Sequence, residues 1–182
     1  MAIILKRNFL FLMVIVVLFI IATILFFKVD RPMVYAPTSN FKDATYDIEG
    51  QKITLKNGFA QTKVSPESIS KITTEYFGNE AVGDLNADGI SDVAFLVTQD
   101  GGGSGTFFYV VVALGSKKGY TGTNAVFIGD RIAPQTTEIR DGQIIVNYAE
   151  RGADEPMSVR PSFGVSKYLK IINTKLIEVK AI

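Results

Sequence analysis

The residues of this chain best suited to chemistry lie in one short stretch, residues 83–92, with the sequence Gly-Asp-Leu-Asn-Ala-Asp-Gly-Ile-Ser-Asp. Closely spaced carboxylates repel one another unless a cation lies among them, and a ligand set made only of oxygen favours a hard ion over zinc or copper. Gly89 supplies the positive φ that a sharp turn around an ion requires. Counted from the first aspartate, oxygens stand at positions one, three, five, seven and nine, and we predict that they bind calcium: Asp84, Asn86, Asp88, the carbonyl of Ile90, and Asp92.

This pattern departs from an EF-hand loop in two ways. The glutamate that an EF-hand carries at position twelve is replaced by Phe95, and a β-branched, apolar run over residues 92–98 follows in place of a helix. The alternative without an ion is a simple turn, because Asp, Asn and Gly favour turns in any case. We prefer calcium because a turn alone does not require oxygens at this regular spacing.

The run Asp-x-Asn-x-Asp-Gly-x-x-Asp before an apolar strand resembles the calcium loops of FG-GAP repeats in integrin-type propellers. The resemblance covers residues 83–92 and implies structural calcium at the five residues named above. It does not imply a propeller, because the motif occurs once in the chain. More broadly, the chain resembles small membrane-anchored bacterial proteins that carry one such loop, a resemblance that implies no activity.

The N-terminal segment from Phe9 to Phe27 contains no charged residue. As a helix rising about 1.5 Å per residue, it is long enough to cross a hydrocarbon core of roughly 30 Å. The alternatives are a buried core helix and a cleaved signal peptide; the second is disfavoured by the length of the run and by Pro37 after the best cleavage site, residues 34–36. We predict a cytoplasmic leader at 1–8, a transmembrane helix at 9–27 and a tether at 28–43.

Positive charge is nearly even on the two sides of this predicted span, with Lys6 and Arg7 before it and Lys28 and Arg31 after it, so counting does not set its orientation. We favour a cytoplasmic N-terminus because the free amine adds charge to a short leader, and because a calcium loop of modest affinity suits a compartment with millimolar calcium. We therefore predict a single-pass membrane protein whose N-terminus is cytoplasmic and whose domain is extracytoplasmic.

Overall charge is almost balanced, with 19 basic and 18 acidic residues, so composition gives no electrostatic reason to expect nucleic acid as a partner. The chain has no histidine, which removes imidazole ligands for zinc and histidine-based nucleophilic catalysis. It has no cysteine and therefore no disulfide, an absence compatible with either side of a membrane.

From residue 44 the pattern is that of β-strands, with short alternating or β-branched runs separated by glycine turns. Asn57-Gly58 and Asp141-Gly142 predict hairpin turns, the first joining strands at 52–55 and 59–62. Residues 93–98 and 106–114 predict a core hairpin whose second strand is covered on both faces. We predict a mainly β fold, a single antiparallel β-sandwich or open-barrel domain over residues 44–182, with the calcium loop at 84–92.

Several functions remain open at this point. The glycine-rich stretch 101–105 lacks the Gly-Lys-Ser/Thr ending of a phosphate-binding loop, so we predict a mobile hairpin connection and no nucleotide. We favour a non-enzymatic, membrane-anchored calcium-binding module of the cell envelope, with the membrane and an envelope protein or glycan as partners. The alternatives are a carboxylate-dependent envelope glycan hydrolase, which needs no histidine, and a protein inhibitor or assembly factor.

Overall fold

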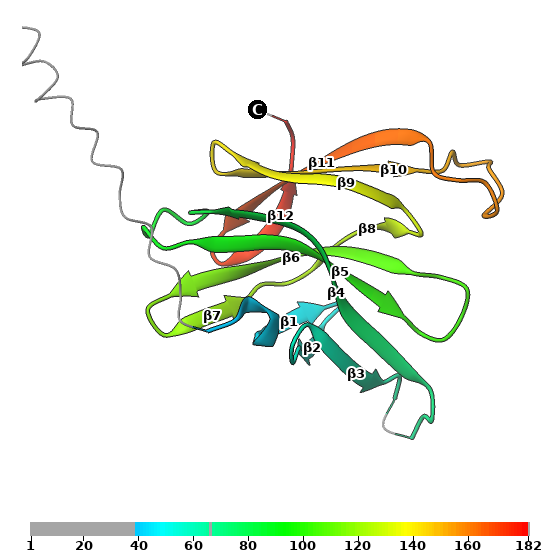
Figure 1. Ribbon diagram of the computed structural model, residues 1–182, viewed down its shortest axis with the longest axis horizontal. Helices are drawn as coiled ribbons and strands as arrows, with labels where there is room; N and C mark the ends of the chain where they lie inside the picture. The colour runs from blue at the N-terminus through cyan, green and yellow to red at the C-terminus, as the bar shows by residue number, and fades with distance from the viewer. Residues whose placement is uncertain (1–38, 66, 182) are drawn as a thin grey trace, which may run out of the picture. The chain divides into compact units, whose positions relative to one another are not determined.

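The computed structural model describes residues 39–65 and 67–181, which all belong to one compact unit. As predicted, this part of the chain is mainly β with antiparallel pairing. Figure 1 labels its strands: β1 Thr45–Ile48, β2 Gln51–Thr54, β3 Phe59–Lys63, β4 Lys71–Gly83, β5 Asp92–Asp100, β6 Phe107–Ser116, β7 Gly119–Gly122, β8 Val126–Asp130, β9 Ala133–Arg140, β10 Gln143–Glu150, β11 Phe163–Ile172 and β12 Lys175–Val179. A short 3-10 helix, η1 (Phe41–Asp43), precedes β1.

The predicted leader 1–8, the predicted transmembrane helix 9–27 and the predicted tether up to residue 38 lie outside the described residues. Within the described ranges, none of the helices combines the length and the apolar composition needed to cross a membrane. Residues 39–43 of the range that we predicted as tether are part of the described structure, and η1 places Phe41 against the rings of Tyr76, Phe95 and Tyr120.

The strands form three sheets. The largest has the order β3-β4-β5-β6-β7, with β8 also pairing β6; a second has the order β12-β11-β10-β9; and β1 and β2 form a separate hairpin. The predicted core hairpin is confirmed, because β5 pairs with β6 in antiparallel register from Val93↔Ala113 to Gln99↔Phe107. The predicted hairpin at Asp141-Gly142 is also confirmed, as it joins β9 to β10.

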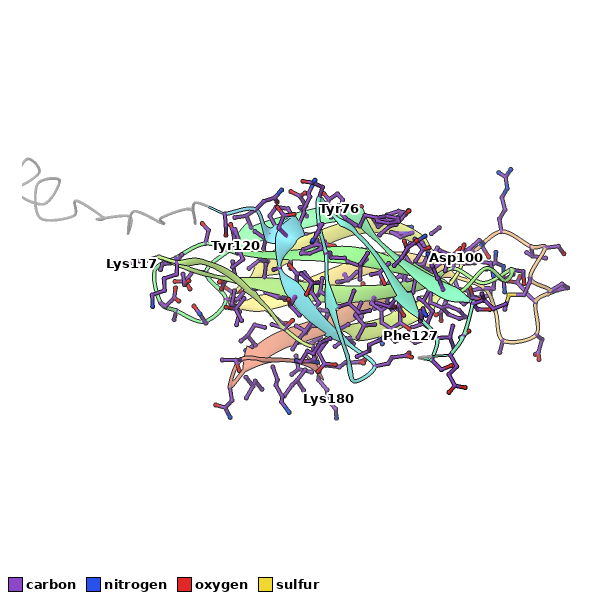
Figure 2. All side chains as sticks on the ribbon, turned by 90° about the horizontal axis from the view of Figure 1, so that it is seen from below. Tyr76, Asp100, Lys117, Tyr120, Phe127 and Lys180 are labelled. Atoms are coloured by element: carbon purple, nitrogen blue, oxygen red, sulfur yellow. The ribbon has the colours of Figure 1, made fainter. Side chains whose placement is uncertain are left out.

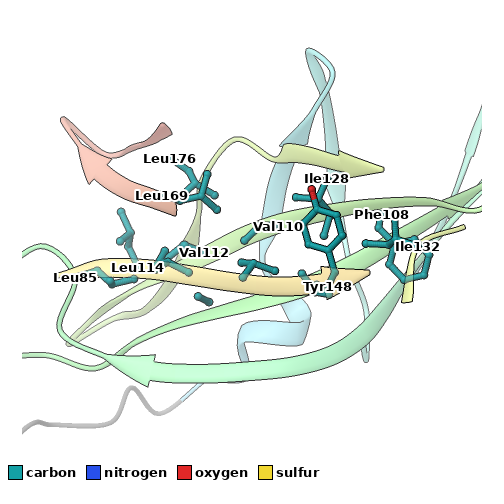
Figure 3. Close-up of a cluster of buried hydrophobic side chains, with 14 residues drawn as sticks. Leu85, Phe108, Val110, Val112, Leu114, Ile128, Ile132, Tyr148, Leu169 and Leu176 are labelled. Carbon is teal, nitrogen blue, oxygen red and sulfur yellow. The ribbon is translucent and has the colours of Figure 1, made fainter. Parts of the chain in front are cut away.

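Residues 93–97 of β5 and 108–114 of β6 alternate between two hydrophobic cores, because successive side chains of a strand point to opposite faces of the sheet. Ala94, Leu96 and the even-numbered residues of β6 pack with side chains of the four-stranded sheet, among them Ile144, Leu169 and Leu176. Figure 3 shows this core. The odd-numbered residues from Val93 to Val97 and from Tyr109 to Ala113 pack with the β1–β2 hairpin in a second core, which also contains Tyr46 and Ile53. The six-stranded sheet is therefore covered on both faces, as predicted for its strand at 106–114.

The predicted hairpin between residues 52–55 and 59–62 is wrong, although its turn is present. Asn57 and Gly58 have φ values of 52° and 79°, as a type I′ turn requires, and Lys56 and Phe59 form an isolated bridge. Beyond that bridge the two strands separate. β2 pairs with β1, whereas β3 pairs with β4 in the six-stranded sheet, so the turn passes the chain from one layer to the next.

Candidate metal site

The predicted calcium loop connects two neighbouring strands of the central sheet. β4 ends at Gly83, β5 begins at Asp92, and the loop spans the residues between them. Leu85 fastens the loop to the domain, because its side chain is buried in the core between the two larger sheets, which also contains Leu114 of β6 (Figure 3). The loop therefore projects from a well-packed end of the sheet.

Asp84 is the centre around which the loop winds. One of its carboxylate oxygens accepts a hydrogen bond from the backbone N–H of Asp88 at 3.1 Å, and the other accepts from the N–H of Gly89 at 2.9 Å. This winding needs left-handed backbone at Ala87 and Gly89, with φ of 61° and 80°. The predicted role of Gly89 is thus consistent with its conformation.

Asn86 and Asp88 are exposed and bonded to each other. The amide nitrogen of Asn86 donates to Oδ2 of Asp88 at 3.0 Å, and Oδ1 of Asn86 accepts from the Asp88 N–H at 3.2 Å. Oδ1 of Asp88 accepts from the N–H of Ile90 at 2.8 Å, so Ile90 enters this network through its amide rather than through the carbonyl that we predicted as a ligand.

Asp92 differs from the other three because its side chain has no exposed surface. Its Oδ2 accepts from the N–H of Leu85 and its Oδ1 from the N–H of Gly115, each at 2.8 Å. Burial raises the pKa of this carboxyl; the two backbone hydrogen bonds act in the opposite direction, and the carboxylates of Asp88 and Asp84 raise it further. Asp92 thus ties the loop to the end of β6, a contact across 23 residues that spacing did not indicate.

The loop oxygens are of the kind that a hard cation prefers, but in this structure they accept hydrogen bonds from backbone amides. The four side chains offer carboxylate and amide oxygens, each with lone pairs beyond those used in the hydrogen bonds above. In the described residues, however, no three acidic, histidine or cysteine side chains converge into a group that would hold a metal ion. An ion would be held by Asp84, Asn86, Asp88 and Asp92, and the hydrogen bond between the exposed side chains of Asn86 and Asp88 would have to give way to it.

Two cavities elsewhere bring together residues that sequence reasoning missed. One, of about 420 Å³, is lined by Glu75 of β4 and Asp100 of β5, so two carboxylates share a cavity outside the calcium loop. The other, of about 390 Å³, joins Glu49 to aromatic residues of β6 and β8. The pairing of β4 with β5 brings Glu75 and Asp100 together, whereas the second grouping depends on the pairing of β6 with β8 and on the contact of Glu49 with Tyr109.

No family model, curated protein or solved structure matches this chain.

Proposed function

We propose that this chain is a membrane-anchored, extracytoplasmic calcium-binding β-domain that acts as a binding or structural module of the cell envelope and performs no catalysis. The domain is an antiparallel β-sandwich of the six- and four-stranded sheets, with the β1–β2 hairpin as an added layer. A helix at residues 9–27 would hold it at the membrane with the N-terminus in the cytoplasm. An envelope protein or glycan would be its partner.

The observation that supports calcium binding is the winding of the loop around Asp84, whose two oxygens each accept a backbone N–H from the far side of the loop. Amide contacts of this kind hold a first-position carboxylate in place while leaving lone pairs for an ion. When bound, calcium would neutralise the clustered carboxylates and fix the connection between β4 and β5. Because both strands belong to the doubly covered sheet, the ion would stabilise the whole domain.

Thermal unfolding of the full-length protein in a maltoside detergent tests this proposal. An ion that binds the folded loop and not the unfolded chain stabilises the domain by RT ln(1 + [L]/Kd). With a Kd near 10⁻⁴ M and about 1 mM calcium, the gain is about 1.4 kcal/mol, or a rise of about 3–8 °C in Tm. Magnesium should substitute poorly because it demands a tighter octahedral site. Identical curves in calcium, magnesium and chelator would mean that the loop is a turn without an ion.

A glycan hydrolase is the second candidate, favoured by the cavity that Glu75 and Asp100 share. Two carboxylates facing one cavity are the minimum that glycoside hydrolysis requires. Incubation of purified envelope glycan with the wild-type protein and with the Glu75→Gln variant separates the candidates. Release of reducing ends by the wild type alone would favour the enzyme.

A pull-down from envelope extracts, with calcium and then with chelator, would identify the partner of a binding module, inhibitor or assembly factor.

A further inference from the structure

The β1–β2 hairpin is shorter than the sheet that it covers. Its strands have four residues each, whereas β5 and β6 have nine and ten. Where the hairpin turns, the sheet face continues, and a cavity of about 390 Å³ opens there. We call this cavity the aromatic pocket; its lining includes Glu49, Ile72, Gln99, Phe107, Tyr109 and Phe127.

The aromatic pocket lies at the opposite end of β6 from the calcium loop, because Phe107 and Tyr109 start that strand whereas Gly115, the partner of Asp92, lies near its end. In Figure 2, Phe127 and Lys117, the residue that follows β6, lie toward opposite ends of the domain. The pocket is therefore a separate site, and its occupation can be tested without calcium.

Aromatic rings form the open wall of the pocket. Phe107 and Phe127 are 40% and 46% exposed, although both lie in strands of the central sheet. Their ring centroids are 6.4 Å apart, and the centroid of Tyr109 lies 5.4 Å from that of Phe127. The faces of such rings carry negative charge density and attract cations.

The carboxylate of Glu49 lies beside these rings. The hydroxyl of Tyr109 donates to Oε1 of Glu49 at 2.7 Å, which fixes the acid of the β1–β2 turn at the edge of the pocket. Among the described residues that line the pocket, Glu49 is the one that carries a charge. The neighbouring Lys167, which reaches the carbonyl of Phe127 at 3.4 Å, pairs with Glu178 at 3.1 Å, so its charge is already matched.

We propose that the aromatic pocket binds a small quaternary ammonium compound of about the size of choline. Aromatic faces beside a carboxylate favour a positive charge, and a volume of about 390 Å³ lies within the usual range of small-molecule sites. A primary ammonium carries three N–H donors that each need an acceptor, whereas a quaternary ammonium needs none. Most of the lining is apolar, because Ile72, Phe107, Tyr109 and Phe127 offer surface to N-methyl groups, and the side-chain acceptors are confined to Glu49, Gln99 and Tyr109.

Ligand-observed NMR on the full-length protein in a maltoside detergent tests this assignment, with chelator present so that the calcium loop plays no part. Choline should bind with a Kd of about 1 mM or below, and its neutral isostere 3,3-dimethylbutan-1-ol should bind about tenfold more weakly, because it has the same shape without the charge. Glycine betaine should also bind more weakly, because its carboxylate faces Glu49.

Three variants complete the test. Glu49→Gln keeps the acceptor for Tyr109 but removes the charge, and Phe127→Leu keeps apolar bulk but removes the ring; each should weaken choline binding about five- to tenfold. Glu75→Gln makes the same charge change in the other cavity and should leave binding unaltered. Equal binding of the neutral isostere, an unchanged affinity in Phe127→Leu, or retention of phosphatidylcholine vesicles without any binding of free choline would overturn the proposal.

Discussion

At the scale of single residues, two carboxylates of the loop have different surroundings. Asp92 is buried and holds the backbone amides of Leu85 and Gly115, whereas Asp88 is exposed and bonded within the loop. Removing an acceptor from a buried donor costs more than removing one from a solvated donor, because water replaces the partner at the surface. The two residues should therefore respond differently to substitution.

We expect Asp92→Asn to lower the free energy of unfolding by about 1–3 kcal/mol even in chelator, because its amide group would face one of the two backbone donors that Asp92 accepts from. Asp88→Ala should cost about 1 kcal/mol or less in chelator but remove most of the stabilisation by calcium. Chemical denaturation of both variants, with and without calcium, measures the two effects. A full calcium response in Asp88→Ala would remove this residue from the ligand set.

A second residue-scale prediction concerns pH. The guanidinium of Arg131 holds the pKa of the Asp130 carboxyl below its ordinary value, and the N–H of Thr106 adds a hydrogen bond at 2.9 Å. A carboxyl whose pKa is lower in the folded than in the unfolded state stabilises the fold above the unfolded pKa and ceases to do so as pH falls through the folded pKa. The stability difference between the wild type and Asp130→Asn should therefore be greater at pH 7 than below about pH 4. Urea denaturation at several pH values measures it, and a constant difference would contradict the assignment.

At the scale of elements, the alternation of apolar residues and the turn sequences could be interpreted from the sequence, but the pairing of the strands could not. The apolar runs of β5 and β6 predicted a doubly covered hairpin because burial on both faces demands apolar residues at every position. The turn at Asn57-Gly58 was predicted correctly, yet it joins strands of different sheets. A two-residue turn fixes its own φ values, whereas β3 is directed by pairing with β4, and nothing local to the turn encodes that partner.

Gly58 itself shows what this turn requires. Its N–H donates to the carbonyl of Lys42 and its carbonyl accepts from Tyr76, and a β-carbon added to it would lie 2.8 Å from Cβ of Tyr76. Gly58→Ala combines left-handed strain with a clash and should cost about 2–4 kcal/mol. Gly142→Ala, with φ of 68° but open space around it, is the matched control and should cost about 1–2 kcal/mol. Thermal unfolding compares them, and equal losses would mean that strain alone decides.

The same limit applies to the candidate sites. The spacing of Asp84, Asn86 and Asp88 identified a loop that the structure winds as one unit, because those contacts are local. The aromatic pocket depends on a hydrogen bond between Glu49 and Tyr109, 60 residues apart, and on the end of a hairpin whose length alternation alone does not fix. Sites built across strands become visible only after register is known.

At the scale of the whole molecule, the remaining prediction is attachment to the membrane. Because the run from Phe9 to Phe27 is uncharged and of bilayer length, the full-length protein should stay in carbonate-washed membranes. Protease added to intact cells that are permeabilised only at the outer face should digest the domain. A shorter form beginning near Pro37 in the soluble envelope fraction would show that the segment is a cleaved signal instead. Protection of the domain from the protease would reverse the orientation.

The way η1 is fastened has a mechanical consequence. A force applied to the chain before Asn40 reaches the domain at Phe41–Ala44. There the backbone N–H of Leu55 donates a hydrogen bond to the carbonyl of Ala44, and the N–H of Gly58 donates to that of Lys42. The ammonium of Lys42 lies 3.7 Å from the ring centroid of Tyr76 and 3.7 Å from Oε1 of Glu80, so this end of the domain is also attached to β4. A force applied at this end therefore acts on β4 as well as on β1. The hydrogen bonds of Ala44 and Lys42 and the contacts of the Lys42 ammonium must break together before β1 can separate from the domain.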